Sequence, residues 1–415
     1  MADVRPFCAI HPAKGYESRI AALPYDVYNR KEAAEKVKND PLSFLNIDRP
    51  ETQFPSGYDM YAPEVYQKAH DMLYDQIRSG FYVQDPQKCY YLYELTMKGR
   101  SQTGLVALSS IDDYCSGVIK KHENTRAEKE KDRIRHVETC RAQTGPIFLA
   151  YRKNETISAV TEEVKKTKSV FDFTSEDGIR HRGWTISDDG QIRLISSAFA
   201  GISSIYIADG HHRAASAVKV GLKMRELSGN SSGEEEYNYF LSVLFPDEEL
   251  MILDYNRVVR DLNGMSEEEF IEKLKSLGDL EKTGPGASLT AGPLKKGEVC
   301  VLLKSSGWFR LTFRNELLSD DPVEGLDVAI LQKYVLDDLI GIHDPTTDQR
   351  IDFVGGIRGL DELERRVRSD CAAAFAMYPT SIVELFAVAD AGLLMPPKST
   401  WFEPKLRSGL YIHTF

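Results

Sequence analysis

Charged and reactive side chains are most densely packed in the segment 209–213, between two stretches of different character. The run 205–207 before it is β-branched and aromatic and predicts a short buried strand. The alanine-rich run from Ala214 predicts a helix. A strand that turns through Gly into a helix presents free backbone N–H groups to anions, which the helix dipole also favours. The segment consists of Asp209, Gly210, His211, His212 and Arg213.

The side chains of this segment suit phosphate chemistry. Its two His and its Arg are donors for phosphate or carboxylate, and Asp209 could act as a base or hold a divalent ion. A purely structural interpretation stays open, because Asp-Gly is a common turn pair and a His pair can fill polar space. The concentration of so many functional residue types in one turn favours a binding or catalytic role.

A second group of candidates lies in the charged stretch 120–136. His122 and Glu123 precede a predicted helix that carries Arg126 and, seven residues on, Arg133 on the same face. A carboxylate beside His and Arg is a reasonable base or metal ligand. The pattern His-Glu-x-x-Arg lacks the second His of the zinc motif. Interleaved Glu and Lys equally describe a solvated helix face, so both interpretations stay open.

The third group lies in the proline-rich loop 395–410, where cations are dense in an otherwise acidic chain. Such a loop beside Trp401 suits an anionic ligand. The alternative is a surface loop that leads into a final strand over 411–415. The candidate substrate-binding residues here are Lys398, Ser399, Thr400, Lys405 and Arg407.

Helices and strands that must position these groups are mixed along the chain. The spacing predicts a helix over 30–40 with Asn29 as its N-cap. It predicts a strand over 44–47, and strands of one sheet over 239–245 and 250–259. The order of elements predicts a mixed α/β or α+β core, and of these two classes we expect α+β, with mixed sheets and packed helices.

One N-terminal segment is rigid because it begins with a proline. Pro24, Tyr25 and Asp26 place an aromatic ring and an acid together, either as a pocket wall or as a buried Tyr with a capping Asp. The residues leave both interpretations open.

Composition restricts the classes of function. The chain has 415 residues, enough for two or three domains, and its formal net charge of -11 argues against binding nucleic acid through phosphate neutralisation. No apolar run reaches the roughly 20 residues that span a bilayer, and the N-terminus lacks a signal-peptide core, so we expect no membrane partner. The six scattered Cys predict free thiols in a reducing cytoplasm.

Taken together, four motifs resemble a bacterial and archaeal domain-of-unknown-function family, family 1015. They are Asp-Gly-His-His-Arg at 209–213, His-Glu-Asn-Thr-Arg at 122–126, Pro-Tyr-Asp-Val at 24–27 and Pro-Lys-Ser-Thr at 397–400. The resemblance implies a ParB/sulfiredoxin-like fold. Its better understood relatives are free-serine kinases, which transfer a phosphoryl group from ADP or ATP to L-serine. This chain is much longer than those kinases, and its C-terminal third has no counterpart in them.

The resemblance implies a catalytic core over 1–262 with an N-terminal extension, and a C-terminal α+β domain over 263–415 whose loop 395–410 packs near the site. It implies that Asp209, His211, His212 and Arg213 lie in the phosphoryl-transfer site, with Gly210 in the phosphate-binding turn. Glu123 is the candidate for activating the serine hydroxyl. His122, Arg126 and Arg133 join the basic loop as substrate-binding candidates.

The function expected from these residues is a phosphotransferase that uses ATP or ADP and phosphorylates a small hydroxy amino acid such as L-serine. Mg²⁺, bound mainly by phosphates, would need only one or two carboxylates, from Asp209 or Glu123. A phosphoserine phosphatase and a non-enzymatic nucleotide or metabolite sensor are the alternatives. The absence of an Asp-x-Asp-x-Thr motif counts against the commonest phosphatase chemistry. We expect small-molecule partners, no nucleic acid, and a homodimer as one allowed assembly.

Overall fold

The computed structural model describes residues 1–125, 127–229, 232–283 and 292–415. The chain forms two compact units, of which the first is Met1–Leu250 together with Pro404–Phe415. The second unit is Met251–Glu403, so it is inserted before the last segment of the first. The division after residue 262 that the sequence suggests stays a prediction.

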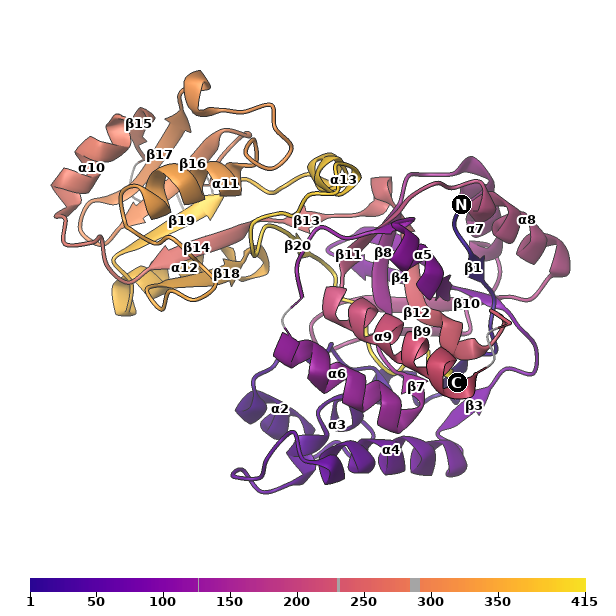
Figure 1. Ribbon diagram of the computed structural model, residues 1–415. Coiled ribbons are helices and arrows are strands. Elements are labelled where there is room, and N and C mark those ends of the chain that lie inside the picture. The colour runs from indigo at the N-terminus through magenta and orange to yellow at the C-terminus, as the bar shows by residue number, and fades with distance from the viewer. Residues whose placement is uncertain (126, 230–231, 284–291) are drawn as a thin grey trace. The chain divides into compact units, whose positions relative to one another are not determined.

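A nine-stranded mixed sheet forms the centre of the first unit (Figure 1). Its path is β6-β11-β8-β12-β5-β4-β10-β9, and β1 pairs with β5 beside that path. The pairs β11–β6 and β12–β8 are parallel and the others antiparallel. The strands are β1 (Val4–Arg5), β4 (Tyr90–Met97), β5 (Arg100–Ser110), β6 (Ile119–Lys120), β8 (Ile147–Tyr151), β9 (Phe171–Thr174), β10 (Arg180–Ile186), β11 (Ile205–Asp209) and β12 (Tyr239–Pro246).

Helices and two small ribbons surround this sheet. In Figure 1, α6 and α9 lie side by side, and α4 lies next to α6; the contacts between these elements agree. The ribbons are β2 (Ile10–Pro12) with β3 (Tyr82–Gln84) and β7 (Ala142–Gln143) with β21 (His413–Thr414). The helices are α1 (Glu17–Ile20), α2 (Arg30–Val37), α3 (Leu45–Asp48), α4 (Pro63–Arg78), α5 (Ile111–Ser116), α6 (Ala127–Cys140), α7 (Glu155–Lys165), α8 (Asp189–Ala200) and α9 (His211–Ser228).

Two apolar cores hold the first unit together. The larger joins the sheet to α7, α8 and α9, and includes the fully buried Trp184 and Phe199. The smaller joins α2, α3 and α4 to the ribbon β2–β3 around Phe44 and Leu73. Burying a side chain of this size contributes about 1.5–3 kcal/mol. The large core fixes β11 and the start of α9, and the small core fixes α3.

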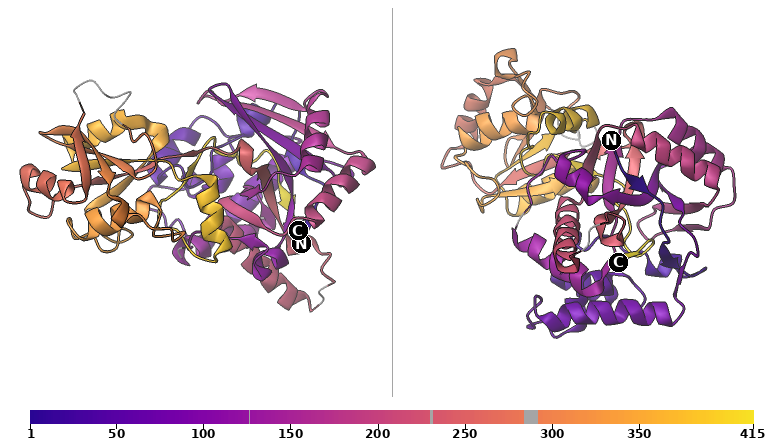
Figure 2. Two further views of the ribbon diagram at one scale, coloured as in Figure 1. Left: turned by 90° about the horizontal axis from the view of Figure 1, so that it is seen from above. Right: turned by 45° about the vertical axis from the view of Figure 1, so that its right-hand side comes forward.

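The second unit is built on a six-stranded antiparallel sheet in the order β15-β17-β16-β19-β14-β18. Helix α12 packs against β14, β16, β18 and β19 of this sheet, and Figure 2 shows the second unit from two further sides. The strands are β14 (Tyr255–Val259), β15 (Gly278–Lys282), β16 (Glu298–Leu303), β17 (Gly307–Phe313), β18 (Ile351–Gly355) and β19 (Ala373–Met377), and a ribbon joins β13 (Ile252–Leu253) to β20 (Trp401–Phe402). The helices are α10 (Glu267–Lys275), α11 (Asp327–Leu331), α12 (Gly359–Ser369) and α13 (Ile382–Asp390).

The α+β class expected from the sequence is confirmed, while a ParB/sulfiredoxin-like core stays a prediction. The helix after Asn29 is also confirmed, with the Asn29 side chain accepting from the Glu32 N–H in a capping box. Among the described residues, no helix is both long and apolar enough to cross a membrane.

Two expectations about local structure are wrong. Residues 44–47 lead into the helix α3, because a short run that is buried on every side shows no period that separates helix from strand. The Asn46 side chain completes this turn by donating to the backbone oxygens of Asp40 and Ser43. The strands at 239–245 and 250–259 belong to different sheets, because the chain enters the second unit after Leu250.

Candidate active site

The motif at 209–213 forms the turn between β11 and α9 that the sequence predicts. The pairing register of β11 with β8 shifts between Ile207 and Asp209, which re-aims the end of the strand. Gly210 follows with φ +93°, a left-handed conformation that favours Gly. Helix α9 then begins at His211 with no side chain capping it. The backbone N–H groups of its first turn are therefore oriented as in an anion-binding helix start.

Two cations surround the Asp209 carboxylate. Its Oδ2 lies 3.2 Å from Lys405 Nζ and 3.9 Å from Arg213 Nη2. Burial would raise the pKa of the Asp209 carboxyl, but Lys405 and Arg213 outweigh burial and hold that pKa well below its usual range. A carboxylate this acidic is a weak proton acceptor, so Asp209 is better suited to fix cations than to act as a general base.

His122, His211 and Glu123 meet beside this turn. The two imidazole rings contact edge to face, with centroids 4.5 Å apart, and the backbone N–H of His122 donates to His211 Nε2 at 3.4 Å. Burial lowers the pKa of His122 to about 4 and that of His211 well below its usual value, so both rings are neutral at pH 7. Because His211 Nε2 accepts, its proton is on Nδ1, which lies 3.7 Å from Glu123 Oε2. The Glu123 carboxylate thus lies next to the neutral His211 ring, at more than hydrogen-bond distance.

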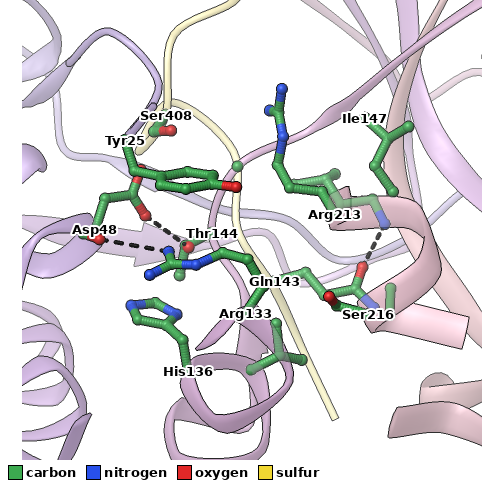
Figure 3. Close-up of a pocket in the computed structure, with 14 residues that line it drawn as sticks. Tyr25, Asp48, Arg133, His136, Gln143, Thr144, Ile147, Arg213, Ser216 and Ser408 are labelled. Carbon is green, nitrogen blue, oxygen red and sulfur yellow. Dashed lines mark hydrogen bonds between the residues drawn. The ribbon is translucent and has the colours of Figure 1, made fainter. Parts of the chain in front are cut away.

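A small pocket, with a cavity volume of about 30 Å³, opens next to Arg213 (Figure 3). It lies entirely within the first unit and joins residues that are distant in sequence. Its lining contains guanidinium, carboxylate, hydroxyl and phenol groups. The polar residues among them are Tyr25, Asp48, Arg133, His136, Gln143, Thr144, Arg213, Ser216 and Ser408.

Opposite charges are fixed in this pocket. Arg133 Nη2 lies 2.7 Å from Asp132 Oδ2, and its guanidinium stacks on the Tyr25 ring, 4.1 Å from the centroid. Burial raises the pKa of Tyr25 to about 12, so its phenol stays neutral. The Asp48 carboxylate also lines the pocket and accepts from Thr144 Oγ1 at 3.0 Å. Figure 3 shows the Asp48 carboxylate and the Arg133 guanidinium on the same side of the pocket.

Arg213 connects the pocket to the turn. Its Nη1 donates to the backbone oxygen of Pro146 at 2.7 Å, its Nη2 faces Asp209, and its side chain lines the pocket. One guanidinium is therefore shared by the turn at 209–213 and the charged pocket.

Of the candidates predicted from the sequence, the structure brings one group together at the turn and its pocket. This group contains His122, Glu123, Arg133, Asp209, Gly210, His211, His212, Arg213 and Lys405.

The remaining candidates are not members of this group. Arg407 pairs with Asp177 on the β9–β10 hairpin. Lys398, Ser399 and Thr400 belong to the second unit, where Lys398 Nζ lies 5.8 Å from the centre of the Tyr255 ring. Arg126 lies outside the described residues.

Asp48, Thr144 and Ser408 line the pocket but are absent from the sequence-based candidates. Asp48 follows a segment expected as a strand, and Thr144 and Ser408 are single hydroxyls in ordinary contexts. No local pattern marks them, because only the tertiary fold brings them to Arg133. For Tyr25, the alternative of a pocket wall is the one that the structure supports.

A divalent ion is compatible with the carboxylates at the turn. Within the described part of the chain, no group of three or more His, Cys, Asp or Glu is arranged to hold a metal ion. A Mg²⁺ bound mainly by phosphates needs only one or two protein carboxylates. The side chains of Asp209 and Glu123 are 32% and 40% exposed, so either can reach such an ion.

The buried His122 is expected to make the first unit labile in acid. Its pKa of about 4 lies below the ordinary 6.5, so the unfolded chain binds more protons between these pH values. Stability from the neutral ring is therefore full above pH 6.5 and is lost as pH falls toward 4. Urea unfolding measures the free energy of unfolding at pH 7.5 and at pH 5. Between these pH values, this free energy should fall by about 2 kcal/mol less in His122→Gln than in the parent protein.

The measurement needs a probe of the first unit alone. Replacing Trp308 and Trp401 with Phe leaves Trp184, which is buried in the first unit, as the only Trp. The matched control is His343→Gln, because the His343 side chain is 82% exposed. Equal acid sensitivity of the parent and His122→Gln would contradict the expectation.

Comparison with known proteins gives the following relations. A family model described as "Protein of unknown function (DUF1015)" matches residues 4–329. No curated protein matches the chain. Similar solved structures include a mutant free serine kinase in complex with AMP, with TM-score 0.36 and 16% identity over 74% of this chain and 92% of that chain. SbnI with a C-terminal truncation from Staphylococcus aureus gives TM-score 0.40 and 11% identity over 74% and 87% of the two chains. A conserved hypothetical protein from Pyrococcus furiosus gives TM-score 0.34 and 15% identity over 74% of this chain and 94% of that chain. Because the family model matches most of its length, this chain belongs to the family DUF1015.

Proposed function

We propose that this protein transfers a phosphoryl group from ATP or ADP to a small hydroxy amino acid such as L-serine. The observation that carries the proposal is that one residue, Arg213, is shared by an anion-binding helix start and by a pocket of mixed charge. A donor phosphate at the turn and an acceptor in the pocket would therefore lie next to each other. The resemblance of the sequence motifs to free-serine kinases supports the same chemistry.

The pocket suits a zwitterion. The guanidinium of Arg133 matches the carboxylate of an amino acid, because its planar donors fit two oxygens. The carboxylate of Asp48 matches the ammonium group. Such a pair of opposite buried charges binds a ligand that carries both charges more tightly than a ligand with a single charge, because a single charge would leave one of the two without a partner. This supports an amino acid over a simple alcohol as the acceptor.

Glu123 is the proposed proton acceptor. Its carboxylate is partly exposed and faces His211, whereas the Asp209 carboxylate is committed to Lys405 and Arg213. Phosphoryl transfer depends mainly on positioning and on neutralising the charge of the phosphate oxygens. Arg213, Lys405 and the N–H groups of the α9 start would supply this neutralisation. Mg²⁺ held by Asp209 or Glu123 would add to it.

The setting that we propose is the cytoplasm. All six cysteines are free, as expected of a protein from a reducing compartment.

Phosphorus NMR of the protein with Mg²⁺, L-serine and either ATP or ADP tests the proposal. Growth of an O-phosphoserine signal with loss of the nucleotide supports it. Release of phosphate from added O-phosphoserine, without transfer to serine, would indicate a phosphatase. Binding of nucleotide without turnover would indicate a sensor, and either of these results rejects the proposed transferase.

A further inference from the structure

The last segment of the chain, Pro404–Phe415, which we call the tail segment, follows the second unit in the sequence but belongs to the first. Two of its side chains reach the candidate site. Lys405 Nζ lies 3.2 Å from Asp209 Oδ2, and Ser408 lines the charged pocket. The site is therefore completed by residues that follow the second unit in the sequence.

Backbone hydrogen bonds hold the tail segment along the pocket. Ser408 and Ala22 exchange two of them, at 2.8 and 3.2 Å. The Gly409 N–H donates to the backbone oxygen of Thr144, another pocket residue, at 3.2 Å. A change in the course of this segment would therefore move the pocket wall itself.

The Arg407 side chain ties the tail segment to the hairpin that joins β9 to β10. It is 5% exposed and forms an ion pair with Asp177 on the hairpin that joins β9 to β10. Its Nη2 also donates to Ser175 Oγ at 3.2 Å, and its Nε to His181 Nε2 at 3.5 Å. Burial and the charge of Arg407 lower the pKa of His181 to about 3, so the neutral ring accepts this hydrogen bond. We call these three partners and Arg407 the clamp.

Asp177 is the only one of the three partners that carries a negative charge. Its removal would leave a buried guanidinium without a counterion, which a protein avoids by moving the charged group toward water. For Arg407, such a movement would pull on the backbone between Lys405 and Ser408. Asp177 itself belongs neither to the pocket lining nor to the turn at 209–213.

We infer that Asp177 is a positioning residue, which acts through Arg407 to hold Lys405 and Ser408 in the site. The inference rests on the proposed function for its kinetic consequence, but its structural consequence can be measured separately. It assigns Arg407 to the clamp and leaves Lys405 as the cation that faces the reacting groups.

The test uses the full-length protein with Asp177→Asn. Hydrogen exchange followed by mass spectrometry is expected to show the amides of Ser408 and Gly409 exchanging about tenfold faster, because their partners are no longer held in place. The KM for L-serine is expected to rise about fivefold or more, with a smaller change in kcat. The displaced pocket wall would weaken the binding of serine more than it slows the transfer step. A merely structural role would lower the thermal midpoint or the active fraction and leave KM unchanged.

Two further variants sharpen the result. Asp177→Glu keeps the negative charge and is expected to restore most of the protection and of the KM. Asp172→Asn removes the partner of the exposed Arg180 on the same hairpin and is expected to change neither quantity. Unchanged tail exchange in Asp177→Asn, or equal effects from Asp172→Asn, would overturn the inference. If L-serine is not a substrate but the tail exchange responds as described, the proposed function fails while the positioning of the tail stands.

Discussion

Glu123→Gln is expected to lower the rate of phosphoryl transfer by about 10²–10⁴-fold, the usual contribution of a general base. The change removes the carboxylate that lies beside His211 and keeps the size of the side chain. Steady-state kinetics with L-serine and the preferred nucleotide measure the effect.

The matched control for this prediction is Glu128→Gln on α6. Glu128 is exposed and lies outside the pocket, so its replacement should leave the rate within about twofold, as for most surface substitutions. Asp209→Asn is expected to reduce turnover as well, but with the pH profile retained, because Asp209 fixes cations. A near-normal rate in Glu123→Gln would remove this residue from the mechanism.

Arg133→Leu is expected to cost about 3–5 kcal/mol of the free energy of unfolding, the usual result of breaking a buried ion pair from one side. The substitution leaves Asp132 buried with only the Tyr66 hydroxyl as a hydrogen-bond donor among its described partners, and it removes the cation that stacks on Tyr25. Urea unfolding followed by the fluorescence of Trp184, in the background without other Trp, measures the loss.

Arg135→Leu provides the comparison on the same helix. Arg135 is exposed and donates one hydrogen bond of 3.3 Å to the backbone oxygen of Tyr61. Its replacement should change the free energy of unfolding by less than about 0.5 kcal/mol. Equal effects of the two substitutions would show that the charge of Arg133 is not anchored as the structure describes.

The turn between β11 and α9 was predictable because its signals are local. A β-branched strand, Gly210 in a left-handed conformation and an alanine-rich helix follow one another without interruption. Arg133 was a candidate because helical spacing puts it on the same predicted face as Arg126, seven residues earlier. Patterns of this kind need only neighbours in the sequence.

The pocket could not be predicted because its partners are set by the tertiary fold. Asp48 meets Arg133 only when α3 packs beside α6, and its own segment carries no helical period. The role of Arg407 could not be predicted either. Its cationic neighbourhood indicates an anionic ligand, but the anion that it meets is Asp177, 230 residues away in the sequence. Likewise, no local signal shows that the chain returns to the first unit after Glu403.

The most direct test of a shared phosphoryl-transfer site is a crystal structure of the protein with ADP and O-phospho-L-serine. We predict a phosphate group at the N–H groups of the turn at 209–213, in contact with Arg213. We also predict the amino acid in the pocket, with its carboxylate on Arg133 and its ammonium group on Asp48. A structure with both ligands bound away from this turn and pocket would contradict the shared site.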